Sequence, residues 1–185
     1  MRNFFPILLA ILFLSACQPD PVLEPDLLNN NDFEASDNDY SGWFANNSAG
    51  TVAISRQESR SGKQSILLSS LASGNNFSFI AQEFSTFEVE RKLKLSAYIK
   101  LKEVEGEGLS IVVRGDTPLP NVNAEWFYTT QGKVQISGTH KWTEYTLITD
   151  DIIPANITRL TVYVVYLANT SGSAWVDDIS LDYVD

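Results

Sequence analysis

The 185-residue chain has a single cysteine and a single histidine, and this scarcity excludes several kinds of site. One cysteine cannot form a disulfide within the chain, so a hydrophobic core must supply the stability. Cys17 and His140 together offer too few sulfur and nitrogen ligands for a structural zinc ion. A Ser-His-Asp arrangement would have to use His140, and the nucleophile-elbow pattern Gly-x-Ser-x-Gly is missing. The sequence therefore disfavours a zinc enzyme and a serine hydrolase.

Basic residues are also few. The chain carries 13 lysines and arginines against 23 aspartates and glutamates, which gives a formal net charge of −10. The basic residues are scattered, and their densest run is Arg91–Lys94. Because neutralising nucleic-acid phosphates requires clustered lysine and arginine, we exclude nucleic acid as a partner. The same charge repels acidic polysaccharides at long range, although a local basic groove could overcome that repulsion.

The only long apolar run lies at the N-terminus, where Phe4–Leu14 is interrupted by nothing but Pro6. It is too short for a bilayer, which takes about 20 helical residues, but it suits the core of a signal peptide. The run closes on Leu14-Ser15-Ala16-Cys17, which resembles the lipobox of bacterial lipoproteins. The resemblance implies cleavage before Cys17 and acylation of that cysteine, for example with palmitate. The alternative is an ordinary secretory signal with an incidental cysteine.

This interpretation divides the chain into three parts. Residues 1–16 are a lipoprotein signal peptide, and residues 17–28 are the lipidated cysteine and a tether rich in proline and acidic residues. Residues 29–185 form one domain, long enough to bury a sizeable core. More than one acyl chain makes membrane anchoring effectively permanent. We therefore expect a lipid-anchored protein of the bacterial cell envelope, at the outer membrane or the cell surface.

The pattern of the domain predicts strands and no long amphipathic helix. Segments rich in Val, Ile, Leu, Thr and aromatic residues are separated by clusters of Gly, Ser and Asn. These segments are 64–70, 77–84, 93–101, 109–114, 125–130, 142–149, 160–167 and 174–184. Strands of this number and spacing predict an all-β fold, an antiparallel β-sandwich of the jelly-roll type.

Alternation within these strands predicts which side chains are buried. In segment 93–101 the odd-numbered residues are apolar, whereas Tyr98 and its polar neighbours share the other face. The alternation in segments 109–114 and 160–167 leaves Arg114 and Tyr163 on the face opposite the aliphatic one. Such a face is either plain solvent surface or the wall of a groove, and periodicity leaves both open.

Several motifs occur in a recognisable order. Asn31-Asp32-Phe33-Glu34 opens the domain, Ser61-Gly62-Lys63 follows, and Val176-Asp177-Asp178-Ile179 lies near its end. This layout is similar to the galactose-binding-like jelly roll of carbohydrate-binding modules in families four, nine and twenty-two. The similarity covers about residues 29–185 and implies a domain that binds a polysaccharide or oligosaccharide.

The resemblance also implies a structural calcium ion (Ca²⁺) between the first strand, the Ser-Gly-Lys loop and the final strand. Its ligands would be the side chains of Glu34 and Asp178 with backbone oxygens from the loop between Glu58 and Lys63. Ca²⁺ takes six to eight oxygens, which carboxylates and carbonyls supply. The alternative is that Glu34 and Asp178 are ordinary acidic residues of turns or strand edges.

The fold does not supply the sugar-contacting residues. We look for aromatic rings, which stack on the C–H faces of sugars, and for arginine, which donates paired hydrogen bonds. The candidates are Tyr98, Arg114, Trp126, Tyr128 and Tyr163, and Trp126 suits the core equally well.

A catalytic role has little support in the sequence. Glycosidases need two carboxylates about 5–10 Å apart, and Asp177 and Asp178 would point to opposite faces of one strand. Jelly-roll polysaccharide lyases use Tyr, Arg and His, so Tyr98, Arg114 and His140 form an enzyme alternative. We expect a non-catalytic glycan-binding lipoprotein. The alternative is a structural lipoprotein that uses the sandwich to contact other envelope proteins.

Lipidation can be tested at Cys17. Cys17→Ser removes the sulfur that would form the thioether, so the protein should move from the membrane fraction into the soluble periplasm or the medium. Cell fractionation and immunoblotting measure this redistribution. Unchanged membrane association, with the signal peptide still cleaved before residue 17, would contradict lipid anchoring.

Overall fold

A computed structural model describes residues 26–37, 39–71, 74–118 and 126–184. The expected signal peptide, Cys17 and most of the tether therefore lie outside the described residues. Within the described ranges, no helix is long and apolar enough to cross a membrane.

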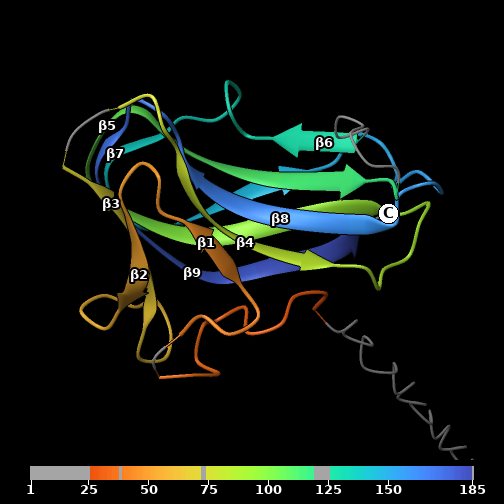
Figure 1. The fold of residues 1–185 in the computed structure, drawn as a ribbon, viewed down its shortest axis with the longest axis horizontal. Coiled ribbons are helices and arrows are strands. Elements are labelled where there is room, and N and C mark those ends of the chain that lie inside the picture. Colours follow the sequence, from red (N-terminus) through yellow and green to blue (C-terminus); the bar gives the residue numbers. More distant parts are fainter. Residues whose placement is uncertain (1–25, 38, 72–73, 119–125, 185) are drawn as a thin grey trace, which may run out of the picture.

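The described residues form nine strands, and every pair of neighbouring strands is antiparallel (Figure 1). They are β1 (Phe44–Asn46), β2 (Thr51–Ser55), β3 (Ser65–Ser70), β4 (Ser78–Phe84), β5 (Lys92–Asp116), β6 (Trp126–Thr129), β7 (Ile136–Ile148), β8 (Arg159–Tyr166) and β9 (Ser171–Val184). Hydrogen-bonded neighbours follow the order β1-β4-β8-β5-β9-β3-β2, with β6 and β7 also paired to β5. The predicted all-β, antiparallel architecture is confirmed.

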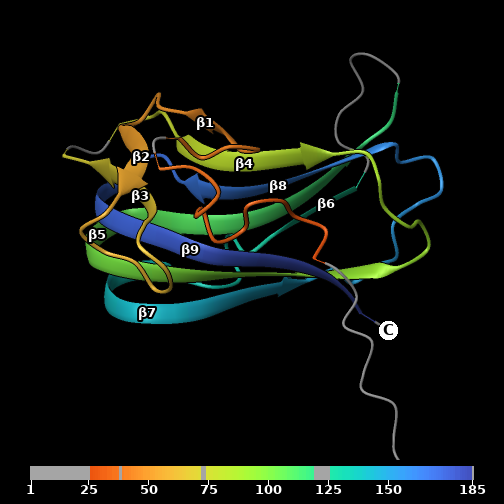
Figure 2. The same ribbon diagram turned by 90° about the horizontal axis from the view of Figure 1, so that it is seen from below.

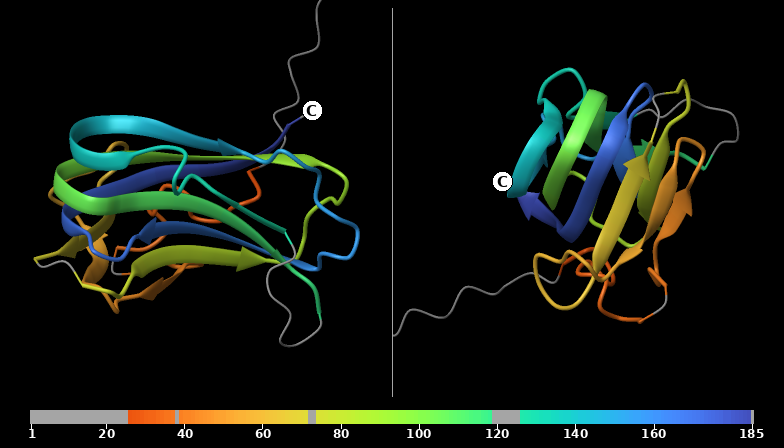
Figure 3. Two further views of the ribbon diagram at one scale, coloured as in Figure 1. Left: turned by 90° about the horizontal axis from the view of Figure 1, so that it is seen from above. Right: turned by 90° about the vertical axis from the view of Figure 1, so that its left-hand side faces the viewer.

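Strand β5 belongs to both layers of the sandwich (Figure 2). Its first half, up to Leu101, pairs with β7 and β9. Its second half pairs with β8 from Leu109 and with β6 from Val112, while Leu109 also pairs with Ile136 at the start of β7. Between the halves, register shifts interrupt the pairing with β7 and β9, and the strand turns over. One layer therefore contains the first half of β5 with β7, β9, β3 and β2, and the other contains its second half with β6, β8, β4 and β1 (Figure 3).

Glycine makes this turn possible. Gly106 has a φ of +85°, and a Cβ at this position would overlap the backbone oxygen of Asn169, so only glycine fits. The sequence pattern predicts two separate strands with a turn between them, and that prediction is wrong. The glycines bend a continuous strand instead of ending it. The short strands β1 and β2, of three and five residues, are not predicted at all.

The core lies between the two layers. The odd-numbered residues from Leu93 to Ile99 in the first half of β5 are at most 1% exposed, as are Ile111 and Val113 in the second half. They form one cluster with Val162 and the other inward residues of β8. Each buried aliphatic side chain contributes about 1.5–3 kcal/mol. The predicted inward faces of these strands are confirmed, so the alternate residues must face outward.

Candidate functional site: an aromatic groove

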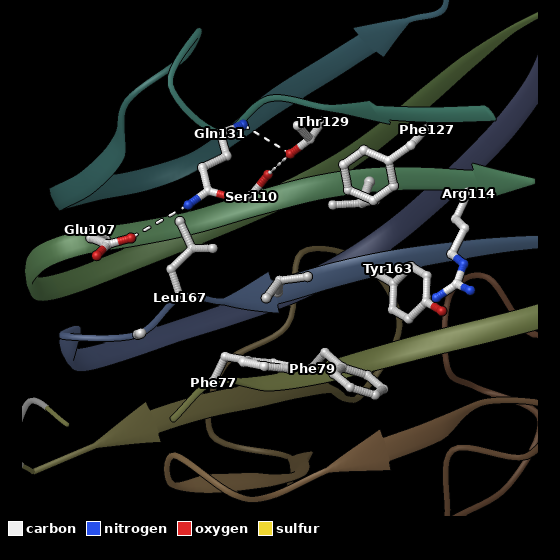
Figure 4. Close-up of a pocket in the computed structure, with 13 residues that line it drawn as sticks. Phe77, Phe79, Glu107, Ser110, Arg114, Phe127, Thr129, Gln131, Tyr163 and Leu167 are labelled. Carbon is white, nitrogen blue, oxygen red and sulfur yellow. Dashed lines mark hydrogen bonds between the residues drawn. The ribbon is translucent and has the colours of Figure 1, made fainter. Parts of the chain in front are cut away.

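A groove of about 540 Å³ runs along the outer face of the second layer (Figure 4). Its floor comes from outward residues of β5 and β8, where Val112 pairs with Tyr163 and Ser110 pairs with Val165. Strand β4 pairs with the far side of β8, and β6 pairs with the far side of β5. The groove therefore lies across the four neighbouring strands β4, β8, β5 and β6.

Phenylalanine rings form the two sides of the groove. Phe77 and Phe79 stand on the β4 side and Phe127 on the β6 side (Figure 4). The rings of Phe77 and Phe79 are 22° from parallel with centroids 6.2 Å apart, and Phe79 meets Tyr163 edge-on at 5.3 Å. Phe77 is 51% exposed and Phe127 is 53% exposed. Exposed rings gathered around one concavity are typical of a binding surface.

Polar groups lie at the two ends of the groove. Arg114 donates from Nε and Nη2 to Asp116 Oδ1, at 2.9 and 2.7 Å, and lies beside Tyr163 (Figure 4). The hydrogen bond with Asp116 raises the pKa of Arg114, whose guanidinium is in any case always cationic in proteins. At the other end, Gln131 Nε2 donates to Glu107 Oε2 at 3.4 Å. The groove thus has a cationic end and an anionic end, separated by an apolar middle.

Arg114 and Tyr163 are the two sequence candidates that line this groove. Tyr98 lies in the first half of β5 and therefore belongs to the opposite layer. There the Arg60 guanidinium covers one face of its ring, 3.5 Å from the centroid. His140 is exposed on β7, which pairs with that same half of β5. The three residues of the lyase alternative therefore do not converge.

Strand β6 turns Phe127 toward the groove, and not the predicted residues Trp126 and Tyr128. Trp126 is 4% exposed and belongs to the core. Tyr128 packs beside it, with ring centroids 5.0 Å apart, and its hydroxyl donates to Asp151 at 2.8 Å. Since side chains alternate along a strand, the residue between them, Phe127, faces the groove. The structure thus places neither Trp126 nor Tyr128 in the groove, and Trp126 takes the core position that the sequence also allowed.

Three rings of the groove, Phe77, Phe79 and Phe127, are not among the residues predicted from the sequence. The spacing of Phe77 and Phe79 is a usable signal, because residues two apart in a strand share a face. Their position beside Tyr163 depends on the pairing of β4 with β8, which are far apart in the sequence.

The loop before β3 gathers the residues assigned to calcium. Glu34 Oε1 accepts hydrogen bonds from the backbone N–H groups of Lys63 and Gln64, at 2.7 and 2.9 Å. The backbone oxygen of Glu58 accepts one from the Ser65 hydroxyl at 2.7 Å. The structure therefore brings Glu34 to the loop, as the resemblance implies. However, the oxygens that would bind calcium already accept hydrogen bonds from protein N–H and O–H groups.

The final strand reaches the same loop through two aspartates. Asp178 accepts hydrogen bonds from Arg60 Nη1 and from the Ser61 hydroxyl, both at 2.7 Å. Asp177 is fully buried and accepts hydrogen bonds from the backbone N–H groups of Arg60 and Ser61, at 2.8 and 3.2 Å. Burial raises the pKa of Asp177 to about 6 in spite of these hydrogen bonds.

This arrangement does not fit a calcium ion. Ca²⁺ requires six to eight oxygens aimed at one point, whereas here N–H groups and a guanidinium are aimed at the carboxylates. In the part of the chain that the structure describes, no group of three or more His, Cys, Asp or Glu side chains could hold a metal ion. Calcium stays a prediction of the resemblance, while the observed contacts give Glu34 and Asp178 the role of acceptors for the loop.

Comparison with known proteins identifies the fold. No protein-family model matches the chain, and neither does any curated protein. Among solved structures, TmCBM61, a family 61 carbohydrate-binding module in complex with β-1,4-galactotriose, matches with a TM-score of 0.60 and 14% identity. This match covers 87% of this chain and 100% of the module. Carbohydrate-binding modules of families 4, 16 and 22 match as well, which confirms the predicted resemblance to these jelly rolls.

Enzyme structures share the fold. A cyclase from Fischerella sp. TAU, solved with 4-(1H-indol-3-yl)butan-2-one, matches with a TM-score of 0.62 and 12% identity over 85% of this chain and 96% of the cyclase. The enzymatically active domain of tailspike protein 4 from bacteriophage CBA120 matches with a TM-score of 0.61 and 16% identity over 86% of this chain. The chain spans 21% of that tailspike chain. At these identities the likeness shows the fold alone, so function must be argued from the groove.

Chelation tests whether Glu34 and Asp178 bind a metal ion or only the loop between Glu58 and Lys63. If loop donors and Arg60 satisfy Glu34 and Asp178, EDTA should leave the melting temperature unchanged. Glu34→Ala should lower the free energy of unfolding by about 1–3 kcal/mol, because two N–H groups lose their acceptor. Asp178→Ala should cost less than about 1 kcal/mol, because its ion pair with Arg60 is partly exposed. A fall of several degrees with EDTA that Asp178→Ala abolishes would instead show that calcium binds here.

Proposed function

We propose that this chain is a non-catalytic glycan-binding lipoprotein of the bacterial cell envelope, anchored in the membrane through a lipidated Cys17, and that the glycan lies in the aromatic groove. The observation that carries the proposal is the pair of exposed rings, Phe77 and Phe127, on opposite sides of a groove that also contains Arg114 and Tyr163.

The exposed rings have enough area to bind a sugar. A ring face that covers about 100 Å² of sugar surface contributes roughly 2.5 kcal/mol. Two such rings give millimolar to micromolar affinity after the cost of association is subtracted. Arg114 adds hydrogen-bond donors whose direction is fixed by Asp116, which reduces the entropy lost on binding.

The lining of the groove favours binding over hydrolysis. Glycosidases use two carboxylates about 5–10 Å apart, and among the described residues that line the groove only Glu107 carries one. Its two oxygens accept hydrogen bonds from Gln131 and Asn169, both at 3.4 Å. The described lining therefore offers a bound glycan no pair of carboxylates able to act as acid and base.

The comparisons and the charge support a neutral glycan as the ligand class. TmCBM61 was solved with a galactotriose, and a matching module from Paenibacillus barcinonensis is a xylan-binding domain. The net charge of −10 repels polyanions at low salt. A neutral polysaccharide or oligosaccharide near the cell surface therefore suits the groove better than an acidic one.

Binding can be tested by calorimetry or affinity electrophoresis against neutral polysaccharides such as β-glucans, xylans, mannans and galactans. At least one should bind with a Kd below about 1 mM. Phe127→Ala should weaken that binding about tenfold or more, because it removes one ring face worth more than about 1.4 kcal/mol. The ring is half exposed, so the melting temperature should change little.

Tyr98→Ala is the matched control, because it removes an aromatic ring from the first half of β5, in the layer opposite the groove. It should leave glycan affinity unchanged. Loss of binding with Tyr98→Ala but not with Phe127→Ala would contradict the groove as the binding site. Failure to bind any glycan, with co-purification of a stoichiometric envelope protein, would favour the structural alternative.

A further inference from the structure

We propose that the groove selects O-acetylated glycans, whose sugar edges carry methyl groups, over the same glycans with free hydroxyls. This inference rests on the proposed function and specifies its ligand. Two features of the groove support it: its apolar walls, and hydroxyl groups that already have partners.

The walls are apolar where the edges of a sugar would lie. Three strand spacings of about 4.8 Å separate the backbones of β4 and β6, roughly 14 Å in all. Phe77 and Phe79 project into this width from one side and Phe127 from the other (Figure 4). A pyranose ring that lies flat on Val112 and Val165 points its equatorial substituents sideways. Those substituents then meet phenyl rings instead of water.

The hydroxyl groups in the middle of the groove are engaged with one another. Ser110 Oγ shares hydrogen bonds with the hydroxyls of Thr129 and Thr130, at 2.8 and 3.1 Å, and Ser110 is fully buried. Thr129 Oγ1 also accepts a hydrogen bond from the backbone N–H of Gln131 at 3.0 Å. These groups have little capacity left for a ligand.

The consequence differs for a hydroxyl and for an acetyl group. A sugar hydroxyl that enters the middle of the groove loses its hydrogen bonds to water and finds no equivalent partner, which weakens binding. An acetyl methyl group in the same place leaves water for contact with Phe127 or Phe79, which strengthens binding. Acetylation also adds no negative charge to the ligand, so it does not increase repulsion by the acidic chain.

The polar ends of the groove favour a polysaccharide over a wholly apolar ligand. Arg114 and Tyr163 lie at one end, and Glu107 and Gln131 lie at the other. Ser110 and Arg114 are four positions apart on β5, which corresponds to about 13 Å along the strand. The apolar middle and the cationic end would therefore contact different sugar units of one chain, an acetylated unit beside a hydroxylated one.

The experiment compares single polysaccharides in two chemical states. The lipidated protein in detergent micelles is titrated with acetylated xylan and acetylated glucomannan, each before and after mild alkaline deacetylation. At least one polymer should bind tenfold or more tightly in its acetylated state. Phe127→Gln makes one wall polar and should reduce this ratio severalfold. Ile148→Gln, at a 54% exposed position on β7 in the opposite layer, should leave the ratio unchanged.

The outcomes separate this inference from the proposed function. Equal binding of the two states, or tighter binding after deacetylation, overturns the acetyl preference and leaves glycan binding in place. A ratio that falls equally with Phe127→Gln and Ile148→Gln overturns the role of the wall. If neither state of either polymer binds but a hydroxyl-rich neutral glycan does, the acetyl preference is overturned as well. Absence of binding to every glycan overturns both.

Discussion

The burial of one face of β5 and β8 is the constraint on which the groove depends. Ile111, Val113 and Val162 are at most 1% exposed, and because side chains alternate along a strand, Arg114 and Tyr163 must face outward. A shift of the register by one residue would carry Arg114 into the core, where an unpaired guanidinium is strongly unfavourable. The hydrophobic effect that stabilises the sandwich therefore also positions the cationic end of the groove.

The sequence predicts the parts of this structure that depend on local pattern. Alternation identifies the strands and the buried faces of β5 and β8, because burial repeats with a period of two. It does not reveal that Gly106 bends one strand through both layers, so Tyr98 and Arg114, which face outward on the same strand, lie in opposite layers. In β6 the inward residue Trp126 and the outward residue Phe127 are both aromatic, so the alternation of residue types does not predict which face of this strand is buried. The groove arises from pairing between distant strands, which no local pattern contains.

The loop between Glu58 and Lys63 shows that predicting which residues lie close together does not predict what they bind. The resemblance to carbohydrate-binding modules implies that Glu34 and Asp178 meet the same loop, and the structure has them there. The chemistry depends on a residue outside the motifs, since the Arg60 guanidinium brings a positive charge to Asp178 from within the chain. A buried or half-buried carboxylate needs compensating donors, and protein N–H groups can supply them as well as a metal can. The same Arg60 side chain also covers the ring of Tyr98. One side chain therefore holds the loop to Asp178 and covers an aromatic ring in the layer opposite the groove.

An NMR titration of methyl-labelled protein with a bound glycan measures directly which layer carries the ligand. If the groove binds the glycan, the methyl resonances of Val112, Val165 and Leu167 should shift in proportion to saturation, since these side chains line it. The Ile148 methyl resonances, on β7 in the opposite layer, should stay in place. Shifts confined to residues around Tyr98 and Ile148, with Val112 and Val165 unchanged, would contradict the groove as the glycan-binding site.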